Sequence, residues 1–183
     1  MKVYNHLDEF EGAINPVVTV GIFDGLHLGH QKILSRLCKA AKEINGESVL
    51  LSFFPHPRVV LYPDQKDLRL LNTLDEKISL LQRTGIDHVI LHPFSLEFSE
   101  LSSDQFIQGI LVEKIGAKKI IIGYDHRFGK GRVGSFEQLK KDHLTYGFKI
   151  EEIAAEDIEN DNISSTKIRK ALATGDVKFA NQF

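Results

Sequence analysis

The fold is indicated most clearly by residues 16–30, which read Pro16-Val17-Val18-Thr19-Val20-Gly21-Ile22-Phe23-Asp24-Gly25-Leu26-His27-Leu28-Gly29-His30. The apolar, β-branched run over 16–23 predicts a strand that is buried on both faces. Two glycines then permit a tight turn, and apolar residues at helical spacing over 28–44 predict a helix directly after it. A buried strand, a glycine turn and a helix in this order are typical of a parallel α/β sheet.

The rest of the chain repeats this alternation. Further apolar runs predict strands at 48–54, 88–92, 119–123 and 148–154. Apolar residues at helical spacing predict helices at 75–83, 103–115, 136–146 and 164–174, and one from Asp176 onward. With right-handed crossovers, this order predicts one Rossmann-like, doubly wound α/β domain over 1–183, with a five-stranded parallel sheet. Residues 55–73 contain three prolines and form a stretch too long for a plain connector, which is typical of functional loops.

Composition excludes several classes of protein. The chain has 183 residues, of which 42% are hydrophobic and 26% are charged, the balance of a water-soluble globular protein. A net charge of 23 − 25 = −2 argues against a nucleic-acid-binding surface. No apolar run approaches the roughly 20 residues that span a bilayer, and the N-terminus lacks the pattern of a signal peptide. The single cysteine, Cys38, excludes an intrachain disulfide and a multi-cysteine zinc site. We expect a cytoplasmic protein with neither nucleic acid nor a membrane as partner.

The turn after the first predicted strand carries the first candidate site. His27 and His30 are three residues apart, so they share one face of the first helical turn. Free N–H groups and the positive end of the helix dipole favour a phosphate there, and imidazoles can donate hydrogen bonds to phosphate oxygens. The glycine spacing is not that of the G-x-G-x-x-G fingerprint, so a nicotinamide cofactor is not indicated. Two alternatives remain: Asp24, His27 and His30 could bind a divalent metal, or they could only cap the helix.

A second candidate site lies at the predicted helix near the C-terminus, which begins Ile163-Ser164-Ser165-Thr166-Lys167-Ile168-Arg169. Three hydroxyl groups at a helix N-terminus can cap the helix and also bind phosphate. Arg169, one turn later, adds a cation that can bind an anion with two hydrogen bonds. The alternative is an ordinary capped helix with solvated basic side chains.

Two more segments follow strand ends, where open α/β sheets bind ligands. The first reads Ser52-Phe53-Phe54-Pro55-His56-Pro57 and joins aromatic surface to a proline-fixed turn that suits a planar ring. The second, residues 123–131, is rich in glycine and charge, and its Asp125 and Arg127 could hold a nucleotide or a metal-bound phosphate. The alternatives are the end of a core strand for the first and a flexible surface loop for the second.

As a set, these four motifs resemble the FMN adenylyltransferase (FAD synthetase) module of prokaryotic bifunctional riboflavin kinase/FMN adenylyltransferases. The matching pieces occur in the family's order and cover almost the whole chain. The His-x-Gly-His piece alone is shared by the wider nucleotidyltransferase superfamily. One residue departs from the pattern, because the family often has phenylalanine where this chain has His126. The family usually continues into a riboflavin kinase domain, so we expect residues 175–183 to begin the linker to such a partner domain.

The resemblance implies the reaction FMN + ATP → FAD + pyrophosphate, with Mg²⁺ bound through the ATP phosphates and not by protein ligands. It implies that three residues take part in catalysis, namely His27, His30 and Arg169. It implies an ATP site made of Gly21, Phe23, Asp24, Gly29, Ser164, Ser165 and Thr166. It implies a flavin site made of Phe54, Pro55, His56, Pro57, Asp125 and Arg127. Two other functions remain open: nucleotidyl transfer to a different phosphate-bearing substrate, and a non-catalytic flavin-binding module.

Overall fold

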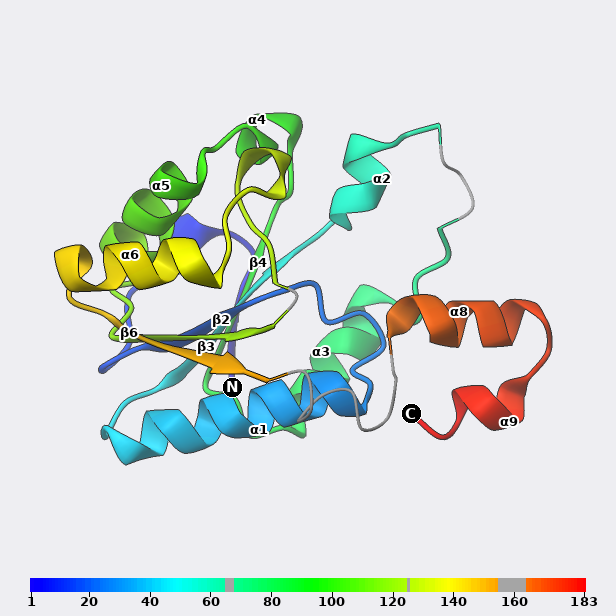
Figure 1. Ribbon diagram of the computed structural model, residues 1–183. Helices are drawn as coiled ribbons and strands as arrows, with labels where there is room; N and C mark the ends of the chain where they lie inside the picture. The colour runs from blue at the N-terminus through cyan, green and yellow to red at the C-terminus, as the bar shows by residue number, and fades with distance from the viewer. Residues whose placement is uncertain (65–67, 125, 155–163) are drawn as a thin grey trace.

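The computed structural model describes residues 1–64, 68–124, 126–154 and 164–183. Its centre is a parallel sheet of six strands in the order β1-β4-β3-β2-β5-β6 (Figure 1). The strands are β1 (Lys2–Tyr4), β2 (Val17–Val20), β3 (Ser48–Phe53), β4 (His88–His92), β5 (Lys119–Gly123) and β6 (Lys149–Ile153). This arrangement confirms the predicted doubly wound α/β class.

The predicted number of strands is wrong, because the sequence pattern does not indicate β1. This edge strand pairs with β4 in the register Lys2↔His88, Val3↔Val89 and Tyr4↔Ile90. Three residues are too few to display the alternation or the apolar run by which a strand is recognised in a sequence. The strand forms because β4 offers it an open edge, which is a tertiary effect.

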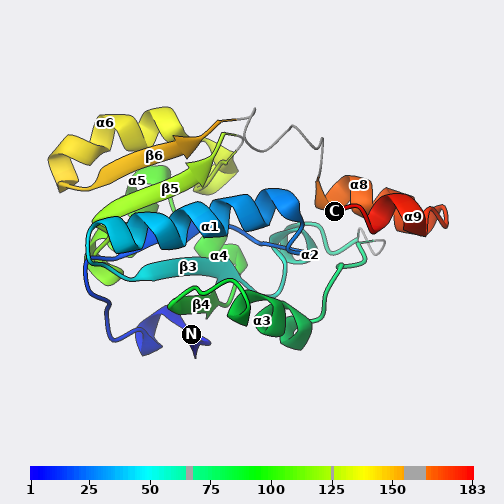
Figure 2. The same cartoon turned by 90° about the horizontal axis from the view of Figure 1, so that it is seen from below.

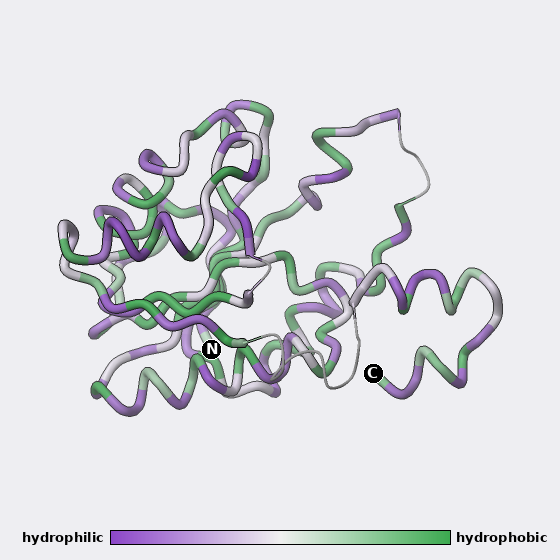
Figure 3. The backbone as a smooth tube through the Cα atoms, in the orientation of Figure 1, coloured by the Kyte–Doolittle hydropathy of each residue, from purple (hydrophilic) through white to green (hydrophobic). Residues whose placement is uncertain are grey.

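Helices cover both faces of the sheet (Figures 1 and 2). One face carries α1 (Leu28–Glu43) and α3 (Leu74–Gln82), and the other carries α5 (Ser103–Gln105), the π-helix η2 (Phe106–Lys114) and α6 (Phe136–Tyr146). Alternate strand residues supply the two cores: in β3, Val49 and Leu51 belong to one and Leu50 to the other. Because both faces are covered, the central strands β2 and β3 are buried throughout and mainly apolar, whereas the edge strand β6 carries Lys149, Glu151 and Glu152 (Figure 3).

Several element boundaries differ from the predictions. The strand expected over 16–23 ends at Val20, where the turn begins. The helix expected over 103–115 is α-helical only as far as Gln105; Ile115 N then donates to the Ile110 carbonyl five residues earlier, at 3.0 Å, as in a π-helix. The stretch 55–73 contains a short helix, α2 (Pro57–Leu61). Three further short helices were not predicted: η1 (Leu7–Glu9), α4 (Leu96–Ser99) and η3 (Lys130–Arg132).

The two predicted C-terminal helices are present as α8 (Ser165–Ala173) and α9 (Val177–Ala180). They pack on each other and lie beyond the end of the sheet at which α1 begins (Figures 1 and 2). That end is formed by the carboxyl ends of the parallel strands, so α8 is placed beside the turn after β2. In the described part of the chain, no helix is both long and apolar enough to cross a bilayer.

Candidate functional site

The turn between β2 and α1 has an unusual backbone. Phe23 (φ 53°), Gly25 (φ 86°) and Leu26 (φ 39°) all have positive φ angles, which are uncommon for residues other than glycine. A Cβ atom on Gly25 would lie 2.5 Å from Cδ1 of Leu71, so any larger residue would require the Leu71 side chain or the turn to move, in addition to the strain of its positive φ angle. This close packing fixes Asp24 at the carboxyl end of the sheet.

A stacked pair of histidines begins α1. His27 is the N-cap residue, and its Nδ1 accepts a hydrogen bond from His30 N at 3.4 Å. The two rings stack with centroids 3.7 Å apart, and the Phe23 ring contacts His30 at 4.8 Å. His30 Nδ1 is buried and finds no hydrogen-bond partner among the described residues. The expected capping role of His27 is therefore real, but capping does not use this His30 nitrogen.

Both imidazoles are neutral near pH 7. Burial lowers the pKa of His27, against the opposing effect of Asp24. Burial also lowers the pKa of His30 well below its usual value, and the charges of His27 and Lys77 lower it further. A neutral imidazole has one N–H donor and one acceptor nitrogen. The pair can therefore donate to an anion without carrying a permanent charge.

An ion pair joins the turn to α8. Asp24 is only 7% exposed; its Oδ2 lies 2.5 Å from Arg169 Nη1, and its Oδ1 accepts from Leu71 N at 2.9 Å. Ser165 Oγ also donates to the Asp24 carbonyl at 2.8 Å. Two segments that are more than 140 residues apart in the sequence are thus held together. The guanidinium has five N–H donors, and the bond to Asp24 uses one of them.

The other hydroxyl groups of α8 differ in their roles. Ser164 is the N-cap and accepts from Lys167 N at 3.3 Å. Thr166 is exposed, and its Oγ1 lies 3.5 Å from Arg169 Nη2. The plain capped-helix interpretation therefore holds for Ser164, whereas Ser165 and Arg169 are directed at the histidine-bearing turn.

The segment after β3 reaches the same end of the sheet. Phe54 is 44% exposed and a cis peptide bond joins it to Pro55; Pro57 is the first residue of α2. His56 caps α2 by accepting from Arg58 N at 3.0 Å. Burial lowers the pKa of His56, and the charges of Arg169, Arg58 and Lys77 lower it further, against Asp24. A small cavity is lined by residues of both this segment and the turn, including Asp24, Phe54 and His56.

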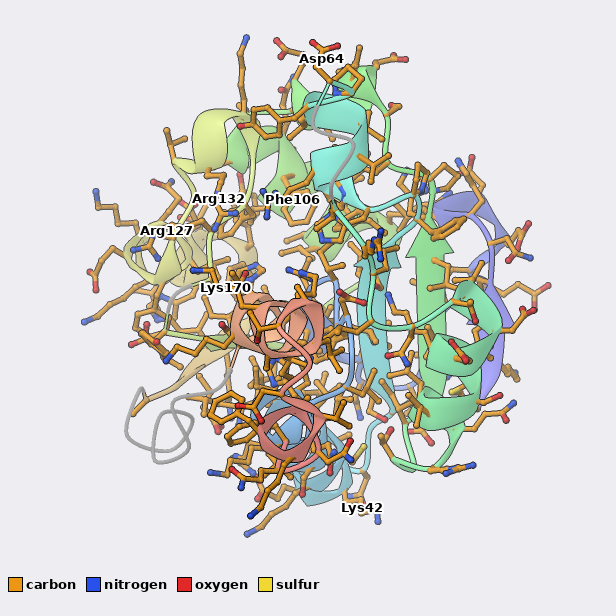
Figure 4. The ribbon with its side chains drawn as sticks, turned by 90° about the vertical axis from the view of Figure 1, so that its right-hand side faces the viewer. Lys42, Asp64, Phe106, Arg127, Arg132 and Lys170 are labelled. Carbon is orange, nitrogen blue, oxygen red and sulfur yellow. The ribbon has the colours of Figure 1, made fainter. Side chains whose placement is uncertain are left out.

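The loop after β5 is less closely tied to the site. Asp125 lies outside the described residues. Arg127 is exposed, and its Nη1 donates to the His126 carbonyl at 2.8 Å. Viewed onto the carboxyl ends of the strands, Arg127 and Arg132 lie on the same side of the molecule as Lys170 of α8 (Figure 4). A ligand role for Asp125 or Arg127 stays a prediction.

One buried residue at the site was missed from the sequence. The ammonium group of Lys77, in α3, donates to the Ile22 carbonyl at 2.5 Å and to Ser52 Oγ at 2.6 Å. Its side chain lies among the same cavity residues. The sequence does contain a signal for this burial, because Lys77 stands one helical turn before the apolar Leu81, and the structure shows both side chains buried. A lysine in the apolar stripe of an amphipathic helix indicates a buried charge.

The donor set bears on the metal alternative. Within residues 1–64, 68–124, 126–154 and 164–183, no three His, Cys, Asp or Glu side chains are grouped so that they could hold a metal ion. Asp24 is the carboxylate beside the histidines, and it is paired with Arg169. These residues therefore suit a phosphate better than a protein-held cation.

Comparison with known proteins identifies the family. The sequence pattern of FAD synthetases matches residues 11–167. The chain belongs to the FAD synthetase family. This confirms the predicted family and the predicted class of enzyme, an FMN adenylyltransferase domain.

Relatives within the FAD synthetase family are named bifunctional riboflavin kinase/FMN adenylyltransferase. The protein from Buchnera aphidicola of Schizaphis graminum is 41% identical over 169 residues, which are 92% of this chain and 54% of that protein. The Listeria monocytogenes protein is 33% identical, over 92% of this chain and 53% of its own length. The Escherichia coli K12 protein is 35% identical, over 90% and 52%. The chain thus spans about half the length of these relatives.

Solved structures agree on the fold. A Streptococcus pneumoniae structure titled a macrolide-efflux protein is 28% identical, with a TM-score of 0.85 over 99% of this chain and 58% of that chain. A pantothenate synthetase from Thermus thermophilus is 14% identical, with a TM-score of 0.54 over 84% of this chain and 62% of that chain. At that identity, the second likeness supports the α/β fold alone.

Proposed function

We propose that this FAD synthetase domain transfers the adenylyl group of ATP to FMN. An FMN phosphate oxygen attacks the α-phosphorus of ATP, a new P–O bond forms, and the bond to the departing pyrophosphate breaks. The observation that carries this proposal is His30 Nδ1, a buried polar atom without a described partner at the start of α1, beside the Asp24–Arg169 pair. No covalent enzyme intermediate is needed, so catalysis rests on positioning and on stabilisation of charge.

The histidine pair is assigned to the ATP phosphates nearest the reaction. Neutral His27 and His30 donate hydrogen bonds to phosphate oxygens as negative charge redistributes in the transition state. The amino end of α1 adds its dipole, although the N–H groups of Leu28, His30 and Gln31 already donate to the Phe183 carbonyl, His27 Nδ1 and the His27 carbonyl. Gly29, in the first turn of α1, lets an anion approach the backbone closely.

The remaining ATP contacts are assigned to the turn and to α8. Arg169 keeps donors beyond the one used by Asp24, and it holds the triphosphate and then the departing pyrophosphate together with Thr166. Ser164 caps α8, and Ser165 ties its first turn to the Asp24 carbonyl. Phe23 supports the histidines from the turn, because its ring contacts the His30 ring. Gly21 makes room for that ring, since a Cβ on Gly21 would lie 2.7 Å from it.

The flavin is assigned to the segment after β3. The exposed Phe54 ring and the Pro55-His56-Pro57 turn offer a rigid apolar surface for the isoalloxazine ring. The charge of Arg127 suits the FMN phosphate, and Asp125 is assigned to this side of the site from the sequence motif alone. Binding at neighbouring strand ends would bring the FMN phosphate up to the ATP α-phosphate.

Magnesium is proposed to enter with the nucleotide, as Mg·ATP. The described residues offer no cluster of three protein ligands, so phosphate oxygens and water would coordinate the ion. Mg²⁺ commonly keeps several water ligands and binds substrate phosphates in this way. When bound, the ion neutralises charge on the triphosphate. A riboflavin kinase domain in a longer form of the protein is likewise a proposal, based on the bifunctional relatives.

The test is an assay of the chain with FMN, ATP and MgCl₂, in which flavins are separated chromatographically and pyrophosphate is measured. We expect FAD and pyrophosphate in equal amounts. Pyrophosphate released only with another phosphate-bearing acceptor would favour a different nucleotidyl transfer. Quenching of FMN fluorescence without FAD or pyrophosphate would favour the non-catalytic flavin-binding module. Phosphorylation of riboflavin by these 183 residues would contradict the assignment of the kinase step to another domain.

A further inference from the structure

We propose that Lys77 is a positioning residue for adenylyl transfer: its buried ammonium group fixes the turn that carries Asp24 and supplies positive charge beside His30 and His56. This inference rests on the proposed function, because it concerns the same site. Lys77 lies outside the motifs by which the family is recognised in this sequence. Its role emerges only when α3 is packed beside the turn and the end of β3.

The hydrogen bonds of Lys77 join three segments. From α3, its Nζ donates to the Ile22 carbonyl, immediately before the positive-φ turn, and to Ser52 Oγ in β3. Ser52 Oγ in turn donates to the same Ile22 carbonyl at 3.2 Å. The Ile22 carbonyl, which precedes Phe23 and Asp24, is thereby held by one donor from α3 and one from β3. A small displacement of this backbone would move Asp24, and through it Arg169, away from the phosphates.

The chemistry of these contacts is unusual for a purely structural lysine. Lys77 is 7% exposed, and both of its hydrogen-bond acceptors are neutral oxygens. Burial of a charge without a direct counter-ion costs free energy. Replacing such a buried charge by an apolar residue of similar size is often neutral or stabilising. A buried ammonium group without a direct counter-ion beside a candidate ligand site therefore points to a functional use of its charge.

The charges around Lys77 indicate what that use is. The groups that face it are Asp24 of the turn, His30 of α1 and His56 of the segment after β3. Asp24 is already paired with Arg169, and burial keeps both imidazoles neutral. Two cations and one carboxylate leave this buried cluster with an excess of one positive charge (2 − 1 = +1). An anionic phosphate compensates that excess, which links Lys77 to the substrate through the electrostatics of the site.

The same surroundings give Lys77 a distinctive pH dependence. Burial lowers the pKa of Lys77 to about 8, and the negative charge of Asp24 raises it only in part. The ammonium form is therefore lost as the pH rises through about 8. We expect kcat to fall on the alkaline side of this value for that reason. An arginine in the same place would keep its charge at every accessible pH.

The experiment compares Lys77→Met, Lys77→Arg and the matched control Gln82→Met, an exposed position on the same helix. FAD formation is measured from pH 6 to pH 10, and thermal melting checks the fold of each variant. We expect kcat of Lys77→Met to be at least ~10-fold lower at pH 7, the scale at which small misplacements act. We expect Lys77→Arg to retain more activity and to lose the alkaline fall near pH 8. Gln82→Met should match the wild type.

A second measurement does not depend on catalysis. Titration of the histidine ring protons by NMR should show higher pKa values for His30 and His56 in Lys77→Met, because the repulsion by the ammonium is gone. If the wild type makes no FAD, the proposed function fails, yet this titration still tests Lys77. Unchanged histidine pKa values, or the same alkaline fall in all three variants, would overturn the inference.

A milder variant covers the case in which neither Lys77 substitution folds. Ser52→Ala removes one acceptor of the ammonium and leaves the lysine in place. The loss of that hydrogen bond should lower the pKa of Lys77 further and move the alkaline fall in kcat to a lower pH. An alkaline fall that stays where it is in the wild type would count against Lys77.

Discussion

At the scale of single residues, His30 carries the strongest functional argument. Leaving a buried polar nitrogen unpaired costs about 1–3 kcal/mol, and His30 Nδ1 is such an atom within the described structure. Its ring is held between His27 and Phe23, so it is well placed but not satisfied. A phosphate at the start of α1 would supply the missing partner. The cost in the free protein is then recovered on binding.

The first prediction concerns His30→Ala. We expect kcat for FAD formation to fall by at least ~10², the typical loss when one stabilising donor is removed from a transition state. The matched control is His143→Ala, because His143 is partly exposed on α6, and its ring is hydrogen-bonded within its own helix, to the Lys140 carbonyl. Steady-state kinetics at saturating FMN and ATP measure the effect. Near-normal FAD formation by a folded His30→Ala would remove His30 from the mechanism.

The second prediction concerns Arg169→Ala. We expect KM for ATP to rise at least ~10-fold, since a charge-assisted hydrogen bond to phosphate contributes about 1.5–3 kcal/mol. The dissociation constant of FMN, measured by fluorescence quenching, should change less than the KM for ATP. The control is Lys170→Ala, one position further along α8 and exposed. Unchanged ATP kinetics in Arg169→Ala would return Arg169 to the solvated-face interpretation.

At the scale of elements, the turn between β2 and α1 sets the geometry of the site. The third prediction compares Gly25→Ala with Gly85→Ala. Both glycines have positive φ angles, but only a Cβ at position 25 would collide, 2.5 Å from Leu71 Cδ1, whereas position 85 has no heavy atom within 4 Å. Each alanine should lose about 1 kcal/mol of stability to backbone strain. Gly25→Ala should in addition lower kcat at least ~10-fold, because the turn or the Leu71 side chain packed on it must shift.

Urea unfolding and FAD formation, measured on both variants, separate strain from displacement. A drop in kcat that is equally large in Gly85→Ala would mean that general destabilisation explains the loss. Full activity in Gly25→Ala would mean that the turn tolerates a shift. Either result would contradict the role given to this close contact.

The elements also show how far sequence reasoning reaches. Long periodic segments such as α1 and β3 were predicted to within a residue or two, because each carries its own pattern. The edge strand β1 and the π-helical turns of η2 were not, since both depend on neighbours in space and leave too little pattern in the sequence. The same holds at the site. His27 and His30 stand in a recognisable motif, whereas Lys77 becomes meaningful only through Ile22 and Ser52.

At the scale of the whole molecule, the substrates would bridge parts of the chain that few contacts now join. The described bonds from α8 to the turn after β2 are Ser165 to the Asp24 carbonyl and Arg169 to the Asp24 carboxylate. Otherwise α8 packs largely on α9, and both stand out from the sheet (Figures 1 and 2). Leu28 N, at the start of α1, also donates to the carbonyl of Phe183 after α9 at 3.1 Å. A triphosphate held by α1 and α8 together would add a further link to these few bonds.

The last prediction follows from that bridge and is measured by amide hydrogen exchange. With Mg²⁺ and a non-reacting ATP analogue at about 100 times its dissociation constant, exchange through openings that release the nucleotide should slow by about 100-fold. We expect this protection over α8 and the first turn of α1. The internal control is α6, which covers the other face of the sheet and should show little local change. Protection confined to α1, with α8 unaffected, would mean that Arg169 does not hold the triphosphate and that α8 serves only as a capped surface helix.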